Sequence, residues 1–190
     1  MYEAEVDPYC YRGSSVLKNL ADIRDDEALA AFESAMVHER NLQSLPRGKL
    51  SVSHYKAIHR HLFQDVYSWA GRFRTVRISK GGSAFCYPDY INGQINDLFQ
   101  RLSRKNFFAE LEAEDFSSEA AAFLSTLNAI HPFREGNGRT QNAFLGMLAS
   151  RAGHQLDFAK LDPETFLPAM IASFHGDDDL LSAEIASLIQ

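Results

Sequence analysis

The chain has 190 residues, of which 45% are hydrophobic, and its formal net charge is −6. This length favours a single domain spanning 1–190, and this composition supports a packed core rather than a disordered chain. The acidic balance argues against a protein that coats nucleic acid, and no apolar run reaches the roughly 18 residues that a membrane-spanning helix needs. Cys10 and Cys86 are the two cysteines, which is too few for a disulfide framework and favours a reducing, cytoplasmic compartment.

Helical spacing dominates the first half of the chain after an N-terminal arm of about 20 residues. Residues 22–42 repeat apolar side chains at helical steps. The side chains expected on the buried face of this helix are Ala28, Phe32, Ala35, Met36 and Leu42. Ser51 is expected to cap a second helix that continues towards Val66, and a third helix is expected to start near Pro88.

One region departs from the helical rhythm. Residues 72–78 alternate and are rich in β-prone side chains, 79–82 have turn chemistry, and 83–87 are expected to return as a second strand. The pattern predicts a short β-hairpin, about 73–87, on an otherwise all-α domain. The same region is basic, with Arg72, Arg74, Arg77 and Lys80. These side chains are interpreted either as a solvated face or as an attraction for an acidic target segment or for ATP.

Helices resume in the second half of the chain. One is expected over 117–130 and another from Asn137 to Gly153, since glycine suits the residue after a helix. The pair Asp162-Pro163 is typical of an N-cap followed by the first helical residue. Asp177 is expected to cap the last helix.

The most informative stretch is residues 131–139, which read HPFREGNGR. Pro132 disfavours a helical conformation at His131, so the chain turns there before the next helix starts. Gly136 and Gly138 allow backbone N–H groups to converge on an anion at that helix start. Glu135 can supply one oxygen to Mg²⁺, and Arg139 can form paired hydrogen bonds to a phosphate.

His131 completes this set, because the ordinary pKa of histidine suits a general base near neutral pH. Taken singly, each residue is ordinary: a His before Pro is usually a turn residue, and an exposed Glu–Arg pair is worth little. The three other histidines that cluster, His54, His59 and His61, lack a set of zinc ligands and are interpreted as solvated or capping residues. The conjunction in 131–139 is therefore the main evidence for function.

These nine residues resemble the signature of Fic domains, His-x-Phe-x-Asp/Glu-Gly-Asn-Gly-Arg-x-x-Arg. Segments 7–9, 62–71 and 174–177 are also similar to that family, so the resemblance spans nearly the whole chain. It implies a mainly helical fold with a β-hairpin flap over the active site. It also implies an enzyme that transfers AMP from ATP to a Ser, Thr or Tyr hydroxyl of a target protein.

The resemblance assigns a role to each residue of the signature loop, 131–142. His131 would deprotonate the target hydroxyl, Phe133 would anchor the loop in the core, and Glu135 would hold Mg²⁺. The phosphates of ATP would be bound by Gly136, Asn137, Gly138 and Arg139.

The hairpin has a matching role as a flap that aligns an extended target segment by main-chain pairing. The expected flap residues are Ile78, Ser79, Lys80, Gly81, Gly82, Ser83, Ala84 and Phe85.

The chain departs from the family pattern at Asn142, where the second Arg is expected. That Arg contacts the terminal phosphate, so its loss implies weaker ATP binding or slower transfer rather than loss of chemistry. The family's inhibitory pattern, Ser/Thr-x-x-x-Glu-Gly/Asn, has no convincing copy in the chain. A small helical antitoxin that supplies the inhibitory Glu is therefore an expected partner, and self-association is common in such a family.

Two alternatives stay open. A Doc-like protein kinase is one, although Doc toxins lack the second Gly of the turn and this chain keeps Gly138. A degenerate Fic domain that only binds nucleotide or a partner protein is the other, and Asn142 is the residue that supports it. Delivery of the protein into a host cell is also compatible with the family.

Overall fold

A computed structural model of the protein describes residues 7–80 and 83–190. Within these ranges the chain forms seven α-helices, two short 3₁₀ turns and one two-stranded hairpin. The helices are α1 (Asp26–Asn41), α2 (Val52–Phe63), α3 (Pro88–Arg104), α4 (Ala113–Ile130), α5 (Asn137–Ala152), α6 (Pro163–Phe174) and α7 (Asp179–Leu188). The 3₁₀ turns are Asn106–Phe108 and Phe158–Lys160, and the strands are β1 (Ser79–Lys80) and β2 (Ser83–Ala84).

Local sequence signals set most helix ends. The Ser51 hydroxyl accepts the His54 N–H at the start of α2, and Asp162 accepts the Glu164 N–H at the start of α6. Pro88 opens α3. Gly153 ends α5 with φ +96°, a conformation that glycine adopts at little cost. These ends confirm the predicted caps, and the mainly helical fold with a short hairpin is confirmed.

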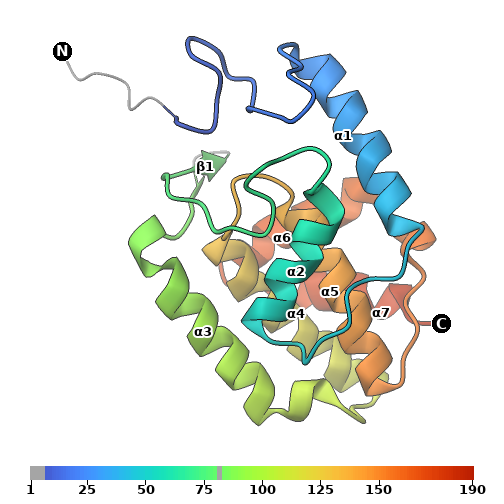
Figure 1. The fold of residues 1–190 in the computed structure, drawn as a ribbon. Coiled ribbons are helices and arrows are strands. Elements are labelled where there is room, and N and C mark those ends of the chain that lie inside the picture. Colours follow the sequence, from blue (N-terminus) through green and yellow to red (C-terminus); the bar gives the residue numbers. More distant parts are fainter. Residues whose placement is uncertain (1–6, 81–82) are drawn as a thin grey trace.

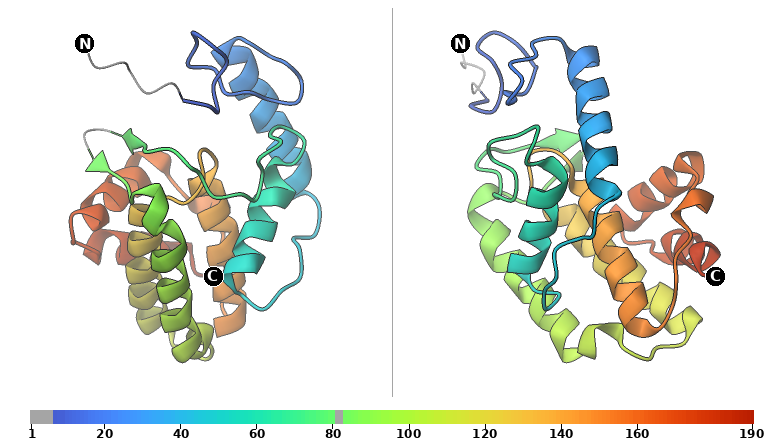
Figure 2. Two further views of the ribbon diagram at one scale, coloured as in Figure 1. Left: turned by 60° about the vertical axis from the view of Figure 1, so that its left-hand side comes forward. Right: turned by 45° about the vertical axis from the view of Figure 1, so that its right-hand side comes forward.

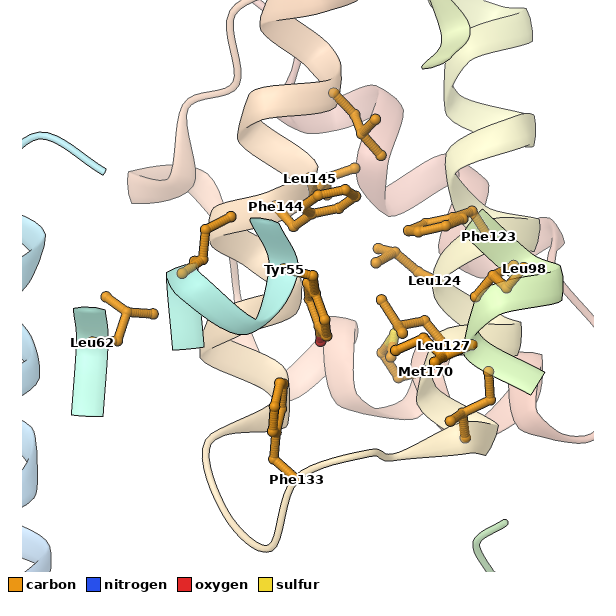
Figure 3. Close-up of a cluster of buried hydrophobic side chains, with 14 of the residues drawn as sticks. Tyr55, Leu62, Leu98, Phe123, Leu124, Leu127, Phe133, Phe144, Leu145 and Met170 are labelled. Atoms are coloured by element: carbon orange, nitrogen blue, oxygen red, sulfur yellow. The ribbon is translucent and has the colours of Figure 1, made fainter. Parts of the chain in front are cut away.

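α4 lies at the centre of the fold. It contacts α3, α5, α6 and α7, while α2 packs on α5 and α1 packs on α2 (Figures 1 and 2). The core between α2, α4 and α5 is dominated by aromatic side chains: Tyr55 faces Phe133 and Phe144 at ring-centre distances of 5.4 Å each (Figure 3). Phe133 is fully buried and thus ties the loop between α4 and α5 to the core.

The buried face of α1 is shifted by one position from the predicted one, and the predicted Phe32 and Met36 are half-buried against the core. The helix buries Leu29, Glu33 and Val37, whereas Leu42 is 71% exposed. Ala28 and Ala35 are exposed as well. The spacing of apolar residues did not identify the buried face because the charged residue Glu33 lies on it, paired with Tyr67 and Arg139.

The hairpin is shorter than predicted. β1 and β2 pair antiparallel, with Ser79 opposite Ala84 and Lys80 opposite Ser83, and the predicted strand over 72–78 does not form. The N–H of Arg74 donates instead to the carbonyl of Pro132 at 2.9 Å, so this segment packs on the loop before α5 rather than on a neighbouring strand. The predicted tip residues Gly81 and Gly82 lie outside the described residues.

The N-terminal arm packs at the same end of the molecule as this loop. Asp7 accepts a hydrogen bond from Nε of Arg134 at 2.9 Å, and Nη2 of the same guanidinium forms an ion pair with it at 2.8 Å. Tyr9 packs edge-on against Trp69, and its hydroxyl accepts the Thr75 N–H at 3.2 Å. The arm therefore braces the loop from outside, while its first six residues lie outside the described part of the chain. Across the described ranges, no helix is long and apolar enough to cross a membrane.

Candidate active site

The signature loop begins where α4 ends. His131 has φ +46° and ψ +62°, a left-handed conformation, and its N–H donates to the carbonyl of Leu127. Pro132 follows and prevents the helix from continuing. The loop then closes on itself, because the Asn137 amide accepts the Phe133 N–H at 3.0 Å and donates to the Phe133 carbonyl at 2.9 Å. The predicted turn at His131 is confirmed, and the loop is rigidly shaped by its own residues.

His131 is oriented for work as a base. Its Nδ1 lies 3.3 Å from the side-chain oxygen of Asn128, which can only accept, so Nδ1 carries the proton and Nε2 keeps a free lone pair. Burial lowers the pKa of His131 to about 4; a hydrogen bond to the Asn128 backbone opposes this shift, and the charges of Arg74 and Lys80 add to it. His131 is therefore neutral at physiological pH, with its Nε2 lone pair unprotonated, and it is a weaker base than a histidine with the ordinary pKa.

A flap residue covers this base. The Phe85 ring stacks on the His131 imidazole with a centre-to-centre distance of 3.9 Å and an interplanar angle of 17°. The Phe85 N–H donates to the Ile78 carbonyl at 3.3 Å, which extends the hairpin pairing beyond β1 and β2. One predicted flap residue, Phe85, therefore lies directly against the predicted base, and Ile78 is tied to it through the hairpin.

The start of α5 has the geometry of an anion cradle. Gly136 has φ +81°, and a Cβ there would lie 2.3 Å from the Phe63 ring, so only glycine fits. Its carbonyl accepts the Thr140 N–H at 3.1 Å, which leaves the N–H groups of 137–139 without acceptors inside the helix. Gly138 is exposed, and a Cβ there would meet nothing within 4 Å. The Asn137 side chain points inward, so this residue can offer phosphate only its backbone.

Glu135 and Arg139 lie beside the cradle. The Glu135 side chain is 45% exposed and accepts the Gly136 N–H at 2.8 Å, and its carboxylate lies 3.6 Å from the Arg139 guanidinium. Asn142, three residues after Arg139 on the same helix face, is half-buried. Within residues 7–80 and 83–190, the Asn142 side chain forms no hydrogen bond.

This donor set fits Mg²⁺. The ion usually takes one or two carboxylates and completes its shell with waters and substrate phosphates. Glu135 offers one carboxylate next to a cradle for phosphate, and the described residues contain no cluster of three or more His, Cys, Asp or Glu that would suit a metal held by protein alone. Glu135 is thus suited to a metal that arrives with a nucleotide.

His59 is a positioning residue that sequence reasoning missed. The prediction of a solvated or capping role is wrong for it, because its side chain is fully buried and stacks on Phe133 at 3.8 Å. Nδ1 accepts the Gly71 N–H at 2.9 Å, so Nε2 carries the proton and donates to the Glu135 carbonyl at 3.0 Å. Burial lowers the pKa of His59 to about 4, which keeps it neutral. His59 therefore fixes the backbone that presents Glu135.

Arg74 is the second missed residue. Both interpretations of Arg74 as a solvent-facing cation are wrong, since the residue is only 2% exposed. Its guanidinium donates to the carbonyls of His131 at 2.8 Å, Val76 at 2.6 Å, Cys86 at 2.5 Å and Ile130 at 3.2 Å. Burial lowers the pKa of Arg74, yet it stays charged. Arg74 ties both legs of the hairpin to the loop that carries His131.

A sequence signal for Arg74 existed. In the alternating segment, position 74 has the same parity as Val76 and Ile78, both of which are half-buried. An Arg on the apolar side of an alternating run is expected to find buried acceptors. The other basic side chains of this region, Arg72, Arg77 and Lys80, are exposed, as the solvated interpretation predicted, although Arg72 shares the parity of Arg74.

Comparisons with known proteins agree with this geometry. The Fic/DOC family model matches residues 49–149, which include α2, the hairpin, α4 and the signature loop. The chain is 50% identical over 189 residues to the probable protein adenylyltransferase y4lH of Sinorhizobium fredii, covering 99% of this chain and 98% of that protein. It is 38% identical over 187 residues to the protein adenylyltransferase VbhT of Bartonella schoenbuchensis, covering 97% of this chain and 39% of that protein.

Solved structures show the same fold. The N-terminal Fic domain of a VirB-translocated Bep effector protein from Bartonella quintana, which carries bound ADP, superposes with a TM-score of 0.87 at 27% identity, covering 96% of this chain and 94% of that one. The type IV secretion system effector protein BepA matches with a TM-score of 0.87 at 31% identity, covering 96% of this chain and 68% of that one. The chain belongs to the Fic/DOC family.

Proposed function

We propose that the protein is an adenylyltransferase that transfers AMP from ATP to a Ser, Thr or Tyr hydroxyl of a target protein. The observation that carries this proposal is the neutral His131 with a free Nε2 beside the anion cradle of α5. A base and a phosphate site on one rigid loop are the two parts that phosphoryl-type transfer needs, since its catalysis relies on positioning and electrostatics. Relatives at 34–50% identity over most of this chain are the protein adenylyltransferase VbhT and two proteins named probable protein adenylyltransferases.

The reaction follows from the roles of the loop residues. The target hydroxyl loses its proton to Nε2 of His131, and the hydroxyl oxygen attacks the α-phosphorus of ATP. The bond from the α-phosphorus to the bridging oxygen breaks, pyrophosphate leaves, and AMP stays on the target as a phosphodiester. The backbone N–H groups at the start of α5 and the Arg139 guanidinium stabilise the charge that develops on the phosphates.

Glu135 is the residue that would hold Mg²⁺. Bound there, the ion would neutralise charge on the ATP phosphates. His59 and the Gly136 N–H keep the Glu135 backbone and carboxylate in place.

The flap is proposed to position the target. β1 and β2 form a two-stranded sheet within the described ranges, and a free strand edge accepts an extended segment by main-chain hydrogen bonds. The stacking of Phe85 on His131 fixes the distance between that edge and the base. A target segment paired to the flap would therefore present its hydroxyl close to Nε2.

Control by a partner is a further part of the proposal. Because the inhibitory pattern is missing from the sequence, a separate small helical protein would supply the inhibitory Glu. We expect the chain purified alone to be active, and to lose activity when it is co-expressed with a helical protein encoded beside it. The absence of such a neighbouring gene would contradict this part, and size-exclusion chromatography would test the self-association that the family suggests. Cell fractionation would decide between action in the bacterial cytoplasm and delivery into a host.

The test of the function uses two labels of ATP. Incubation with Mg²⁺, cell lysate and ATP labelled at the α-phosphate should label target proteins, whereas ATP labelled at the γ-phosphate should not. Label from the γ-phosphate alone would indicate the kinase reaction instead. No label from either ATP, with nucleotide binding retained, would indicate a nucleotide-binding module, the alternative that Asn142 supports.

A further inference from the structure

Glu33 is a buried carboxylate outside the part of the chain that the family model matches. It lies on α1, whereas the match covers residues 49–149. Its side chain is 10% exposed, between the apolar Leu29 and Val37 of the same helix face. An ionised carboxylate is costly to bury unless it is paired and hydrogen-bonded, so its partners indicate why it is there.

Both oxygens of Glu33 have a partner, and both partners point to the active site. One oxygen accepts the Tyr67 hydroxyl, and the other forms an ion pair with Nη2 of Arg139. Burial, with a smaller contribution from Glu33, raises the pKa of Tyr67, so this hydroxyl keeps its proton and remains a donor. Tyr67 is in turn fixed by stacking on Trp69 at 4.4 Å.

Arg139 is therefore held from three sides. Its guanidinium lies over the Phe63 ring at 4.7 Å, pairs with Glu33 and lies 3.6 Å from Glu135. Within residues 7–80 and 83–190, only Nη2 of the guanidinium donates a hydrogen bond. Because a planar guanidinium offers five N–H donors, the donors on Nε and Nη1 stay available.

We propose that Glu33, supported by Tyr67, is a positioning residue that sets the orientation of Arg139 for phosphate. This inference rests on the proposed function, in which Arg139 binds the phosphates of ATP. Folding of α1 onto the site immobilises the long Arg side chain before ATP arrives, so binding loses less conformational entropy. The arrangement matters more in this chain than in relatives with the full signature, because Asn142 leaves Arg139 as the single signature Arg at the cradle.

The experiment is a double-mutant cycle in which calorimetry measures the affinity of the full chain for ATP in Mg²⁺. Glu33→Gln keeps the shape of the side chain but removes its charge, and it should weaken ATP binding about 5- to 10-fold, since the contact it removes is charge-assisted. In an Arg139→Ala background the same change should alter affinity by less than about twofold, because the residue it positions is gone.

Two variants complete the cycle. Tyr67→Phe removes one of the two contacts to Glu33 and should weaken binding by about two- to threefold, again only when Arg139 is present. It keeps the inference testable if Glu33→Gln does not fold. Glu39→Gln is the matched control, since Glu39 is an exposed residue of the same helix, and it should bind ATP as the native chain does.

Three results would overturn the inference. Tighter ATP binding or faster AMP transfer by Glu33→Gln would mean that Glu33 competes with phosphate for Arg139. An equal loss of affinity in both backgrounds would mean that Glu33 only supports the fold. If Arg139→Ala binds ATP as tightly as the native chain, Arg139 does not bind the phosphates and that part of the proposed function is refuted. This result is distinct from the first two, which concern Glu33 alone.

Discussion

Arg74 is the residue whose loss should uncouple the flap from the base. Arg74→Met removes a guanidinium that donates to four carbonyls, two on the legs of the hairpin and two at the end of α4. Each buried acceptor left without a donor costs about 1–3 kcal/mol, and the desolvation of the guanidinium itself offsets part of that sum. We therefore expect a net loss of about 3 kcal/mol in the free energy of unfolding.

For a chain of this size, about 3 kcal/mol corresponds to a fall in Tm of roughly 6–12 °C. Calorimetry or circular dichroism measures this change, and labelling from α-labelled ATP measures activity. Transfer should fall by about 10-fold or more, because Phe85 and His131 no longer share a fixed backbone. The Tm and the transfer rate of Arg74→Lys should lie between those of the native chain and those of Arg74→Met, since one ammonium reaches fewer carbonyls than a guanidinium.

The matched control is Arg72→Met, which removes an exposed Arg two residues earlier and should change stability by less than about 0.5 kcal/mol. If Arg74→Met and Arg72→Met have the same Tm and the same transfer rate, the coupling assigned to Arg74 is wrong.

Three further predictions follow from the site. The pKa values of His59 and His131 are lowered to about 4, so the unfolded chain binds more protons than the folded chain between about pH 6.5 and 4. The contribution of these histidines to the free energy of unfolding should be fully present above pH 6.5 and should fall by about 3 kcal/mol per histidine as the pH drops to 4. Urea midpoints that stay constant over this range would refute the pKa shifts. Gly136→Ala forces a Cβ into the Phe63 ring at positive φ, so it should lower the free energy of unfolding in urea by about 2–4 kcal/mol. Gly138→Ala should lower it by less than about 1 kcal/mol, and equal losses in the two variants would contradict the cradle geometry. Asn142→Arg should tighten ATP binding about 10-fold by restoring a charged contact, and Asn142→Gln is the uncharged control. If Asn142→Arg binds ATP no more tightly than the native chain, position 142 does not limit binding.

The local features of the fold were predictable because they depend on neighbouring residues. The caps at Ser51 and Asp162, the start at Pro88 and the end at Gly153 need only the sequence around them. The turn at His131 follows from Pro132 in the same way. These signals fix where helices begin and end, and they also placed the signature loop between α4 and α5.

The remaining features depend on contacts between distant parts of the chain. His59 and Glu33 are polar residues at buried positions, and their acceptors and donors lie 76 and 106 residues away, on Glu135 and Arg139. A pattern of apolar spacing cannot identify such positions, which is why the buried face of α1 was misplaced. The strand predicted over 72–78 failed for the same reason, since Arg74 satisfies the carbonyls of the loop rather than those of a strand.

The most direct test of the central claim is label transfer from α-labelled ATP by His131→Ala, with ATP affinity measured on the same preparation. The account predicts that target labelling falls to background while ATP binding changes by less than about twofold, because His131 acts on the hydroxyl and not on the phosphates. Labelling that persists in His131→Ala at the native rate would contradict the account.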